Sequence, residues 1–305
     1  MNPVNADHPL LVATDFSAPS RQAAGRAARL AHETGAPMHL LHVMPGDAID
    51  QLRQWLGMDS PPEHAMQAHA QRQLDEMAGA LAEAHRVTVQ SHCASGPVID
   101  EILRRAQAVD APLLVLGARG AGFMRRLILG TTAERLMRRS SRPLLVVRQK
   151  AHEPYRRVLV AVDFSAWSLP AVATARRVAP HAHLVLMPVF SVPFEDKLRY
   201  AGVEEATIEH YRQQARQRAR DRLMALAERA DLKPGHWEPR VIEGEASMRL
   251  VEQEQELDCD LVVLGKHGQT VTEDLLLGSV TRHVLAEGSA DVLISTAREE
   301  AASPA

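Results

Sequence analysis

Short apolar runs alternate along the chain with longer stretches in which apolar residues recur every three or four positions. The short runs predict strands and the longer stretches predict helices. In the first half the predicted strands are 9–14, 37–43, 87–93, 112–117 and 143–148, and the predicted helices are 20–34, 63–85, 97–109 and 131–139. The second half has predicted strands at 157–162, 182–189, 237–242, 260–265 and 291–295, again with helices between them. Near-continuous apolar strands joined by helices indicate an α/β fold, a parallel sheet covered on both faces.

The two halves are copies of one unit. The segment Val12–Ser17 recurs 148 residues later as Val160–Ser165. Three glycines of the first half keep the same offset from three of the second, and the pairs are Gly117 with Gly265, Gly120 with Gly268, and Gly130 with Gly278. A constant offset over more than a hundred residues indicates a tandem duplication. We expect one domain at 1–150 and a second at 151–305, with Pro154 near the junction.

Composition narrows the class of protein. With 46% hydrophobic and 24% charged residues in 305, the chain is typical of a globular protein. No apolar run approaches the roughly 20 residues that span a bilayer, and residues 1–8 lack the basic and apolar regions of a secretory signal. Two cysteines cannot form a disulfide framework, and a net charge of −3 argues against general nucleic-acid binding. We therefore expect a cytoplasmic protein without a membrane partner.

The candidate chemistry lies where predicted strands end. Ligands of open α/β sheets bind at the carboxyl ends of the strands, where the winding direction reverses. Asp15 and Asp163 follow the first strand of each half, and Gly117 and Gly265 end the fourth. If the strand order is flavodoxin-like, these four residues meet at the reversal point.

The loop after the fourth strand predicts an anion site. Gly130-Thr131-Thr132 and Gly278-Ser279 directly precede a predicted helix. Free N–H groups at a helix N-terminus, with a hydroxyl beside them, are suited to phosphate. The alternative is an ordinary turn with an N-cap residue. The same spacing in both halves favours the anion site.

Common nucleotide and hydrolase motifs are missing. The sequence contains no Gly-x4-Gly-Lys-(Ser/Thr) and no Gly-x-Ser-x-Gly. The glycines after Leu116 do not read Gly-x-Gly-x-x-Gly, and they follow the fourth strand rather than the first. A motor ATPase, a dinucleotide dehydrogenase and a serine hydrolase are therefore disfavoured.

The pattern Gly-x2-Gly-x9-Gly-(Ser/Thr), together with an Asp after the first strand, resembles the universal stress protein family over nearly the whole chain. The resemblance implies two tandem flavodoxin-like or Rossmann-like domains with strand order 3-2-1-4-5 that bind ATP, with Mg²⁺ or Mn²⁺ held through the phosphates. The Asp and its neighbours would contact adenine or ribose, and the glycines and hydroxyls would hold the phosphates. Carried over, the nucleotide-binding residues are Ala13, Thr14, Asp15, Val43, Gly117, Gly120, Gly130, Thr131 and Thr132 in the first half, and Ala161, Val162, Asp163, Val189, Gly265, Gly268, Gly278, Ser279 and Val280 in the second.

The function that this resemblance implies is a nucleotide-dependent regulatory module in a stress response, read by an unidentified protein partner. A slow ATPase or self-phosphorylating enzyme is the first alternative, although no catalytic residue and no protein metal ligand stands out. A scaffold with one degenerate site that binds another ligand is the second. Family members commonly pair through the last strand, so we expect an internal pseudo-dimer, and a homodimer is open.

Two charge patterns separate the halves. Arg125-Arg126 lies between the glycines of the first half, where the second has Glu273-Asp274. If these side chains face the phosphates, the first half binds ATP more tightly, whereas a solvated loop is the favoured interpretation. In the second half, Arg212, Arg216 and Arg220 recur every four residues and predict a solvated helix stripe, with an acidic partner as the alternative.

Overall fold

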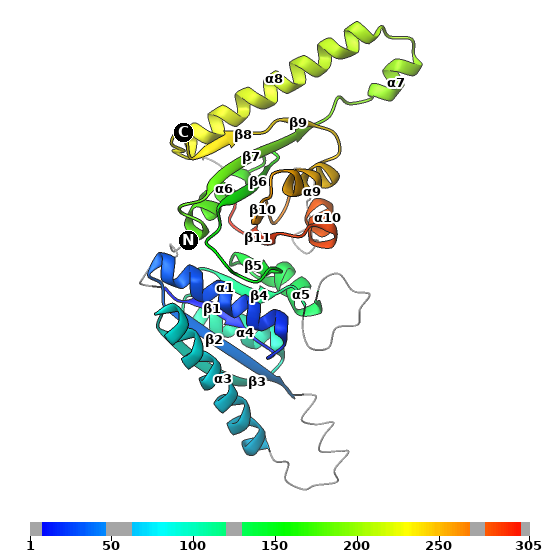
Figure 1. Cartoon of the computed structure of the whole chain (residues 1–305). Coiled ribbons are helices and arrows are strands. Elements are labelled where there is room, and N and C mark those ends of the chain that lie inside the picture. Colours follow the sequence, from blue (N-terminus) through cyan, green and yellow to red (C-terminus); the bar gives the residue numbers. More distant parts are fainter. Residues whose placement is uncertain (1–7, 47–62, 120–129, 269–277, 300–305) are drawn as a thin grey trace, which may run out of the picture. The chain divides into compact units, whose positions relative to one another are not determined.

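Two stretches of chain, Met1–Pro154 and Tyr155–Ala305, each fold around parallel strands flanked by helices (Figure 1). The computed structural model describes residues 8–46, 63–119, 130–268 and 278–299. Each unit is built from strand–helix–strand crossovers, which place successive parallel strands side by side.

The first unit has the strand order β3-β2-β1-β4-β5 with every pair parallel. Its strands are β1 (Leu10–Ala13), β2 (Met38–Pro45), β3 (Val89–Gly96), β4 (Leu114–Gly117) and β5 (Leu144–Val147). Its helices are α1 (Ala18–Thr34), α3 (Glu63–His85), α4 (Val98–Ala108) and α5 (Thr131–Arg139). Helices α1 and α3 contact each other, as do α4 and α5, so the two pairs cover opposite faces of the sheet.

The second unit repeats this plan as β8-β7-β6-β10-β11, again with parallel pairs. Its strands are β6 (Arg157–Val162), β7 (His183–Phe190), β8 (Trp237–Pro239), β9 (Ile242–Glu243), β10 (Leu261–Gly265) and β11 (Asp291–Ser295). Its helices are α6 (Ser168–Val178), α7 (Glu195–Tyr200), α8 (Glu205–Arg229), α9 (Ala246–Glu256) and α10 (Ser279–Glu287). Numbered from its own first strand, each unit has the order 3-2-1-4-5, so the predicted fold class is confirmed.

One predicted strand is divided. The run 237–242 forms β8 and β9, which both pair with β7 but are separated by Arg240 and Val241. Pro239, the last residue of β8, lies opposite Leu186, and the Arg240 amide donates to the Leu186 carbonyl at 2.9 Å. Pairing with β7 resumes in β9, where Ile242 lies opposite Val189.

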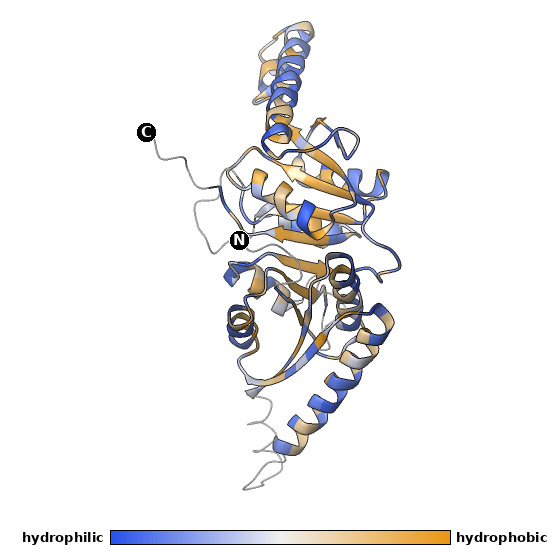
Figure 2. Cartoon of the chain, turned by 90° about the vertical axis from the view of Figure 1, so that its left-hand side faces the viewer, coloured by the Kyte–Doolittle hydropathy of each residue, from blue (hydrophilic) through white to orange (hydrophobic). Residues whose placement is uncertain are grey.

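The strands form the core and the helices shield it. Figure 2 shows hydrophobic strands beside helices whose outer faces are hydrophilic. Aromatic residues are only 4% of the chain, and small side chains let a helix pack close to the sheet. On α1 the buried face includes five alanines that are no more than 1% exposed, namely Ala23, Ala24, Ala27, Ala28 and Ala31. This helix therefore lies close to β4, and its first turn borders the end of that strand.

Candidate functional site

A cavity of about 340 Å³ opens at the carboxyl ends of β1, β2 and β4 in the first unit. Its wall is completed by the first turn of α5 and by residues of α4. Eight of the nine predicted residues line it, namely Ala13, Thr14, Asp15, Val43, Gly117, Gly130, Thr131 and Thr132. The ninth, Gly120, lies outside the described residues, as do Arg125 and Arg126.

Hydrogen bonds within the chain hold the segment after β1. The Ser17 amide donates to Oδ1 of Asp15 at 3.1 Å, and the Phe16 amide donates to the Thr14 hydroxyl at 3.1 Å. Phe16 has a φ of 62° and its ring centroid lies 4.3 Å from that of His42. Nδ1 of His42 is 2.8 Å from the Thr14 carbonyl oxygen. Asp15, an exposed residue, lines the cavity.

Backbone groups build the side of the cavity at the start of α5. The Gly130 amide donates to the Ala118 carbonyl at 2.8 Å, which brings the start of α5 beside the end of β4. Gly130 is the N-cap residue, and no side-chain hydrogen bond caps the helix. Thr131 is therefore the first helical residue and not the cap. The N–H groups of this first turn can donate hydrogen bonds to an anion. A helix N-terminus beside the glycine loop is the geometry that the sequence predicts.

The second unit has the matching cavity, with a volume of about 600 Å³. All nine predicted residues line it, namely Ala161, Val162, Asp163, Val189, Gly265, Gly268, Gly278, Ser279 and Val280. Gly278 is again an N-cap residue without a side-chain cap, and α10 begins at Ser279. Glu273 and Asp274 lie outside the described residues.

Asp163 is also held by hydrogen bonds within the turn that follows the first strand of its unit. Its Oδ1 accepts the Ser165 amide and the Ser168 hydroxyl, each at 2.9 Å. Phe164, with a φ of 62°, has the backbone conformation of Phe16. The duplicated sequence therefore gives the same turn at the same place in both units.

The glycines that end β4 and β10 are required by packing. None of the described glycines of the motif, Gly117, Gly130, Gly265, Gly268 and Gly278, has a positive φ. A Cβ on Gly117 would lie 2.8 Å from the carbonyl carbon of Pro19, and one on Gly265 would lie 2.9 Å from Cβ of Trp167. Each strand end thus packs directly against the start of the helix that follows the first strand of its unit, α1 for Gly117 and α6 for Gly265.

Charged residues that the sequence analysis did not assign to a site also line the second cavity. Arg218 and Arg222 of α8 project into it, together with Lys266 and His267. The sequence could have indicated the two arginines, because Arg218 and Arg222 are a second pair spaced by four residues within the arginine run. In the first unit, Arg119 and His42 were likewise not assigned.

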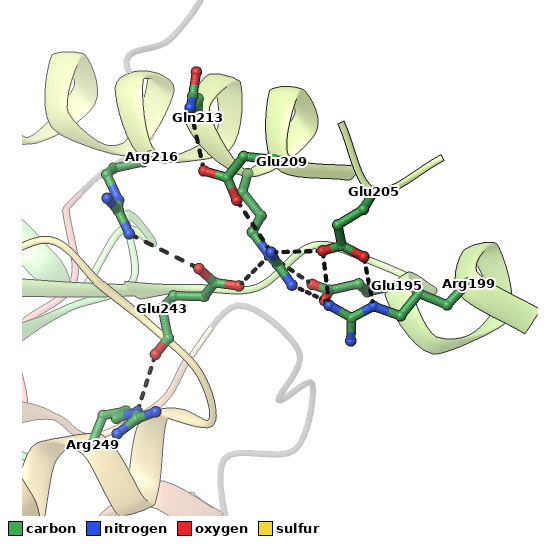
Figure 3. Close-up of polar contacts among 9 residues, drawn as sticks. Glu195, Arg199, Glu205, Glu209, Gln213, Arg216, Glu243 and Arg249 are labelled. Atoms are coloured by element: carbon green, nitrogen blue, oxygen red, sulfur yellow. Dashed lines mark hydrogen bonds and ion pairs between the residues drawn. The ribbon is translucent and has the colours of Figure 1, made fainter. Parts of the chain in front are cut away.

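The predicted arginine stripe is not solvated along its length. The Arg212 side chain is 21% exposed and forms ion pairs with four carboxylates, those of Glu195, Glu205, Glu209 and Glu243. Figure 3 shows how these acidic groups converge from α7, α8 and β9. Hydrogen bonds to Glu195 and Glu209 raise the pKa of Arg212 above its ordinary value. The prediction was wrong for Arg212 because Glu195 and Glu243 of neighbouring elements join two acidic residues of the same helix around it.

Among the residues that the structure describes, no group of three or more His, Cys, Asp or Glu side chains is arranged to hold a metal ion. Within the same residues, no helix has the length and apolar character needed to cross a membrane. The two cavities at the strand ends are therefore the candidate sites.

Comparison with known proteins agrees with this architecture. The model of the universal stress protein family matches residues 8–148 and 154–295. A universal stress protein of Mycolicibacterium smegmatis is 28% identical over 299 residues, covering 94% of this chain and 97% of that protein. Universal stress protein G of Salmonella typhimurium is 31% identical over 129 residues, covering 42% of this chain and 89% of its own.

Solved structures share the fold over the whole chain. A universal stress protein from Archaeoglobus fulgidus superposes with a TM-score of 0.70 at 16% identity, covering 96% of this chain and 97% of that one. The two family matches together extend over nearly all of the sequence. The chain belongs to the universal stress protein family.

Proposed function

We propose that each unit is a nucleotide-binding domain and that the chain binds ATP in both cavities as a regulatory module of the stress response. The observation that carries this proposal is the duplicated cavity. The described residues that family resemblance assigns to nucleotide binding, 17 of the predicted 18, line two cavities at equivalent strand ends.

The chemistry of each cavity suits the parts of a nucleotide. The uncapped first turns of α5 and α10 offer N–H groups to phosphate oxygens, with Thr131, Thr132 and Ser279 beside them. Asp15 and Asp163 offer carboxylate oxygens to ribose hydroxyls. Mg²⁺ would be held through the phosphates and water, since it binds few protein oxygens in such sites.

The distribution of carboxylates supports a binding role over a catalytic one. Asp15 is the only carboxylate among the described residues that line the first cavity, and Asp163 holds that position in the second. Both follow the first strand of their unit, on the side assigned to adenosine. Neither described cavity wall therefore offers a second carboxylate as a base for attack on the γ-phosphate.

A ligand can nevertheless change the protein surface. Its phosphates would join the loop after β4 to the start of α5, and the loop after β10 to the start of α10. The Gly130 amide donates to the Ala118 carbonyl, so a ligand at the start of α5 acts on the end of β4 as well. A partner protein can recognise the surface of the occupied state.

Calorimetric titration of nucleotide-free protein with MgATP tests the proposal, with ADP assayed in the same sample. We expect two ATP per chain and no turnover. Thr131→Glu places a negative charge at the first cavity, and Ser279→Glu does so at the second. A carboxylate is favourable at a helix N-terminus, so both helices should persist. Each variant should lose one ATP, and the double variant should lose both.

Thr131→Gln and Ser279→Gln are the matched controls, because they add the same bulk without charge and should retain binding. The proposal is wrong if the unchanged protein binds no ATP. Steady ADP formation that Thr131→Glu or Ser279→Glu abolishes would instead favour the slow ATPase. One ATP per chain, lost only in Thr131→Glu, would favour a second unit with another ligand.

A further inference from the structure

The described walls of the two cavities differ in charge. Among the described lining residues, the first has one carboxylate, Asp15, and one full cation, Arg119. The second sets one carboxylate, Asp163, against three cations, Arg218, Arg222 and Lys266. The second cavity is also larger, at about 600 Å³ against about 340 Å³. Its walls therefore suit a ligand with more negative charge.

The extra arginines come from one helix, and the duplication shows what they replace. Buried residues align α3 with α8 at an offset of 149, since Ala70 and Leu74 correspond to Ala219 and Leu223. At this register, His69 and Gln73 of the first unit stand where the second has Arg218 and Arg222. The cationic wall is thus specific to the second unit.

These two arginines are available to a ligand, unlike others on the same helix. Arg212 and Arg216 are engaged by carboxylates, including Glu243. Neither Arg218 nor Arg222 forms an ion pair with any residue that the structure describes, and both are exposed. Two guanidinium groups spaced by four residues lie on one side of a helix, where together they can clasp an anion such as phosphate.

Arg222 is positioned over the floor of the cavity. Its guanidinium carbon lies 4.3 Å from the ring centroid of Phe164, the second residue after β6. Strand β6 neighbours β10, whose end carries the Gly265–Gly268 loop. Arg222 and this loop therefore line the same cavity from neighbouring elements, so one ligand can contact both.

We propose that the second cavity binds a nucleotide that carries a second phosphate group besides its 5′-phosphate chain, and that Arg218 and Arg222 hold the second phosphate. The proposal rests on the proposed function, because the 5′ phosphates are assigned to the start of α10. The Asp163 carboxylate does not oppose it fully, since its Oδ1 accepts two hydrogen bonds within the turn. Guanidinium pairs are well suited to phosphate because their donors match its oxygens.

Tryptophan fluorescence can report this cavity alone. Trp167 lines it, and the chain has three tryptophans. The full chain with Trp55→Phe and Trp237→Phe retains Trp167, and its fluorescence is followed during titration. The probes are adenosine 3′,5′-bisphosphate, adenosine 5′-monophosphate, MgATP and inorganic phosphate. We expect the bisphosphate to bind at least about tenfold more tightly than the monophosphate, the gain of roughly one charge-assisted hydrogen bond.

The substitutions Arg218→His and Arg222→Gln, made together, install the residues of the first unit and should abolish that preference. Arg220→Gln removes a charge from the same helix outside this cavity and should retain it. Equal affinity for the bisphosphate and the monophosphate overturns the inference, as does a preference that survives the double substitution. Inorganic phosphate that competes as strongly as the bisphosphate also overturns it, because the site would then not select a nucleotide.

Failure of the proposed function gives a different result. If calorimetry finds ATP bound and Trp167 shows no bisphosphate preference, only the inference falls. If the bisphosphate binds and ATP binds at neither cavity, the ATP proposal falls and the arginine site stands.

Discussion

Nε of Arg212 lies 3.2 Å from Oε1 of Glu243, which ties α8 to β9. Glu243 also accepts a hydrogen bond at its backbone carbonyl from Nε of Arg249, at the start of α9. One short strand therefore connects two helices that both contribute to the wall of the second cavity. The position of α8, and with it that of the cationic wall, depends on this network.

Replacement of Arg212 by Ala should loosen α7 and the first turns of α8. It removes the shared partner of Glu195, Glu205 and Glu209, and leaves these carboxylates to repel one another. Hydrogen–deuterium exchange should become faster in residues 195–212 than in the unchanged chain. Limited proteolysis should cut the same region sooner.

Arg220→Ala is the control for that prediction, because Arg220 forms no ion pair with any described residue. It should leave exchange in 195–212 unchanged. Equal exchange in Arg212→Ala and the unchanged chain would show that the network does not hold the helix.

The fold could be predicted from the sequence because the hydrophobic pattern of each half and the internal duplication indicate the same α/β unit. Apolar runs such as Leu114–Gly117 and Leu261–Gly265 became β4 and β10, each paired in parallel with the first strand of its own unit. The 237–242 run could not be predicted to divide, since the break depends on how this run meets β7.

The site was predicted in part for a related reason. Asp15 and Gly117 stand at strand ends, and the ends of parallel strands meet wherever the order reverses, so sequence position places them. Arg218 and Arg222 come from a helix whose rotation about its axis is fixed by buried contacts such as that of Leu223. Which arginines face the cavity and which face Glu243 is decided by this packing.

Gly117→Ala should destabilise the chain. The added Cβ would meet backbone atoms of Pro19 at 2.8 Å, and backbone cannot move aside as a flexible side chain can. Overpacking of this kind costs about 1–3 kcal/mol. Urea unfolding followed by circular dichroism measures the change in the free energy of unfolding.

Gly25→Ala provides the comparison within α1. Its added Cβ would have nothing within 4 Å, and alanine in a helix interior is favoured over glycine by roughly 0.5–1 kcal/mol. We expect Gly25→Ala to be slightly more stable than the unchanged chain. Similar stabilities for Gly117→Ala and Gly25→Ala would refute the packing role of Gly117.

His39 should make the chain less stable in mild acid. Burial, with the nearby charges of Arg105 and His92, lowers the pKa of His39 below its ordinary 6.5. As the pH falls below about 6.5, the unfolded chain takes up a proton that the folded chain resists. The free energy of unfolding should therefore decrease from pH 7.5 to pH 5.5, with the loss continuing until the folded state is protonated.

His39→Gln should reduce this dependence, as measured by urea unfolding of the full chain at both pH values. Some dependence should remain, because burial also lowers the pKa of His85 and His92. The same pH dependence in His39→Gln and in the unchanged chain would contradict the assignment.

Both cysteines should be unreactive in the folded protein. Cys93 lies on β3 and Cys259 directly precedes Asp260 and β10, with exposed fractions of 7% and 6%. Burial raises the pKa of the Cys93 thiol and raises that of Cys259 to about 12. Because the thiolate is the reactive form, an aromatic disulfide reagent at pH 8 should label Cys259 more than about a hundredfold more slowly in the folded chain than in guanidinium chloride.

Two variants separate the labelling rates of the two cysteines. Cys93→Ala isolates the Cys259 rate and Cys259→Ala isolates that of Cys93. Rapid labelling of the folded Cys93→Ala chain would mean that Cys259 is accessible as a thiolate.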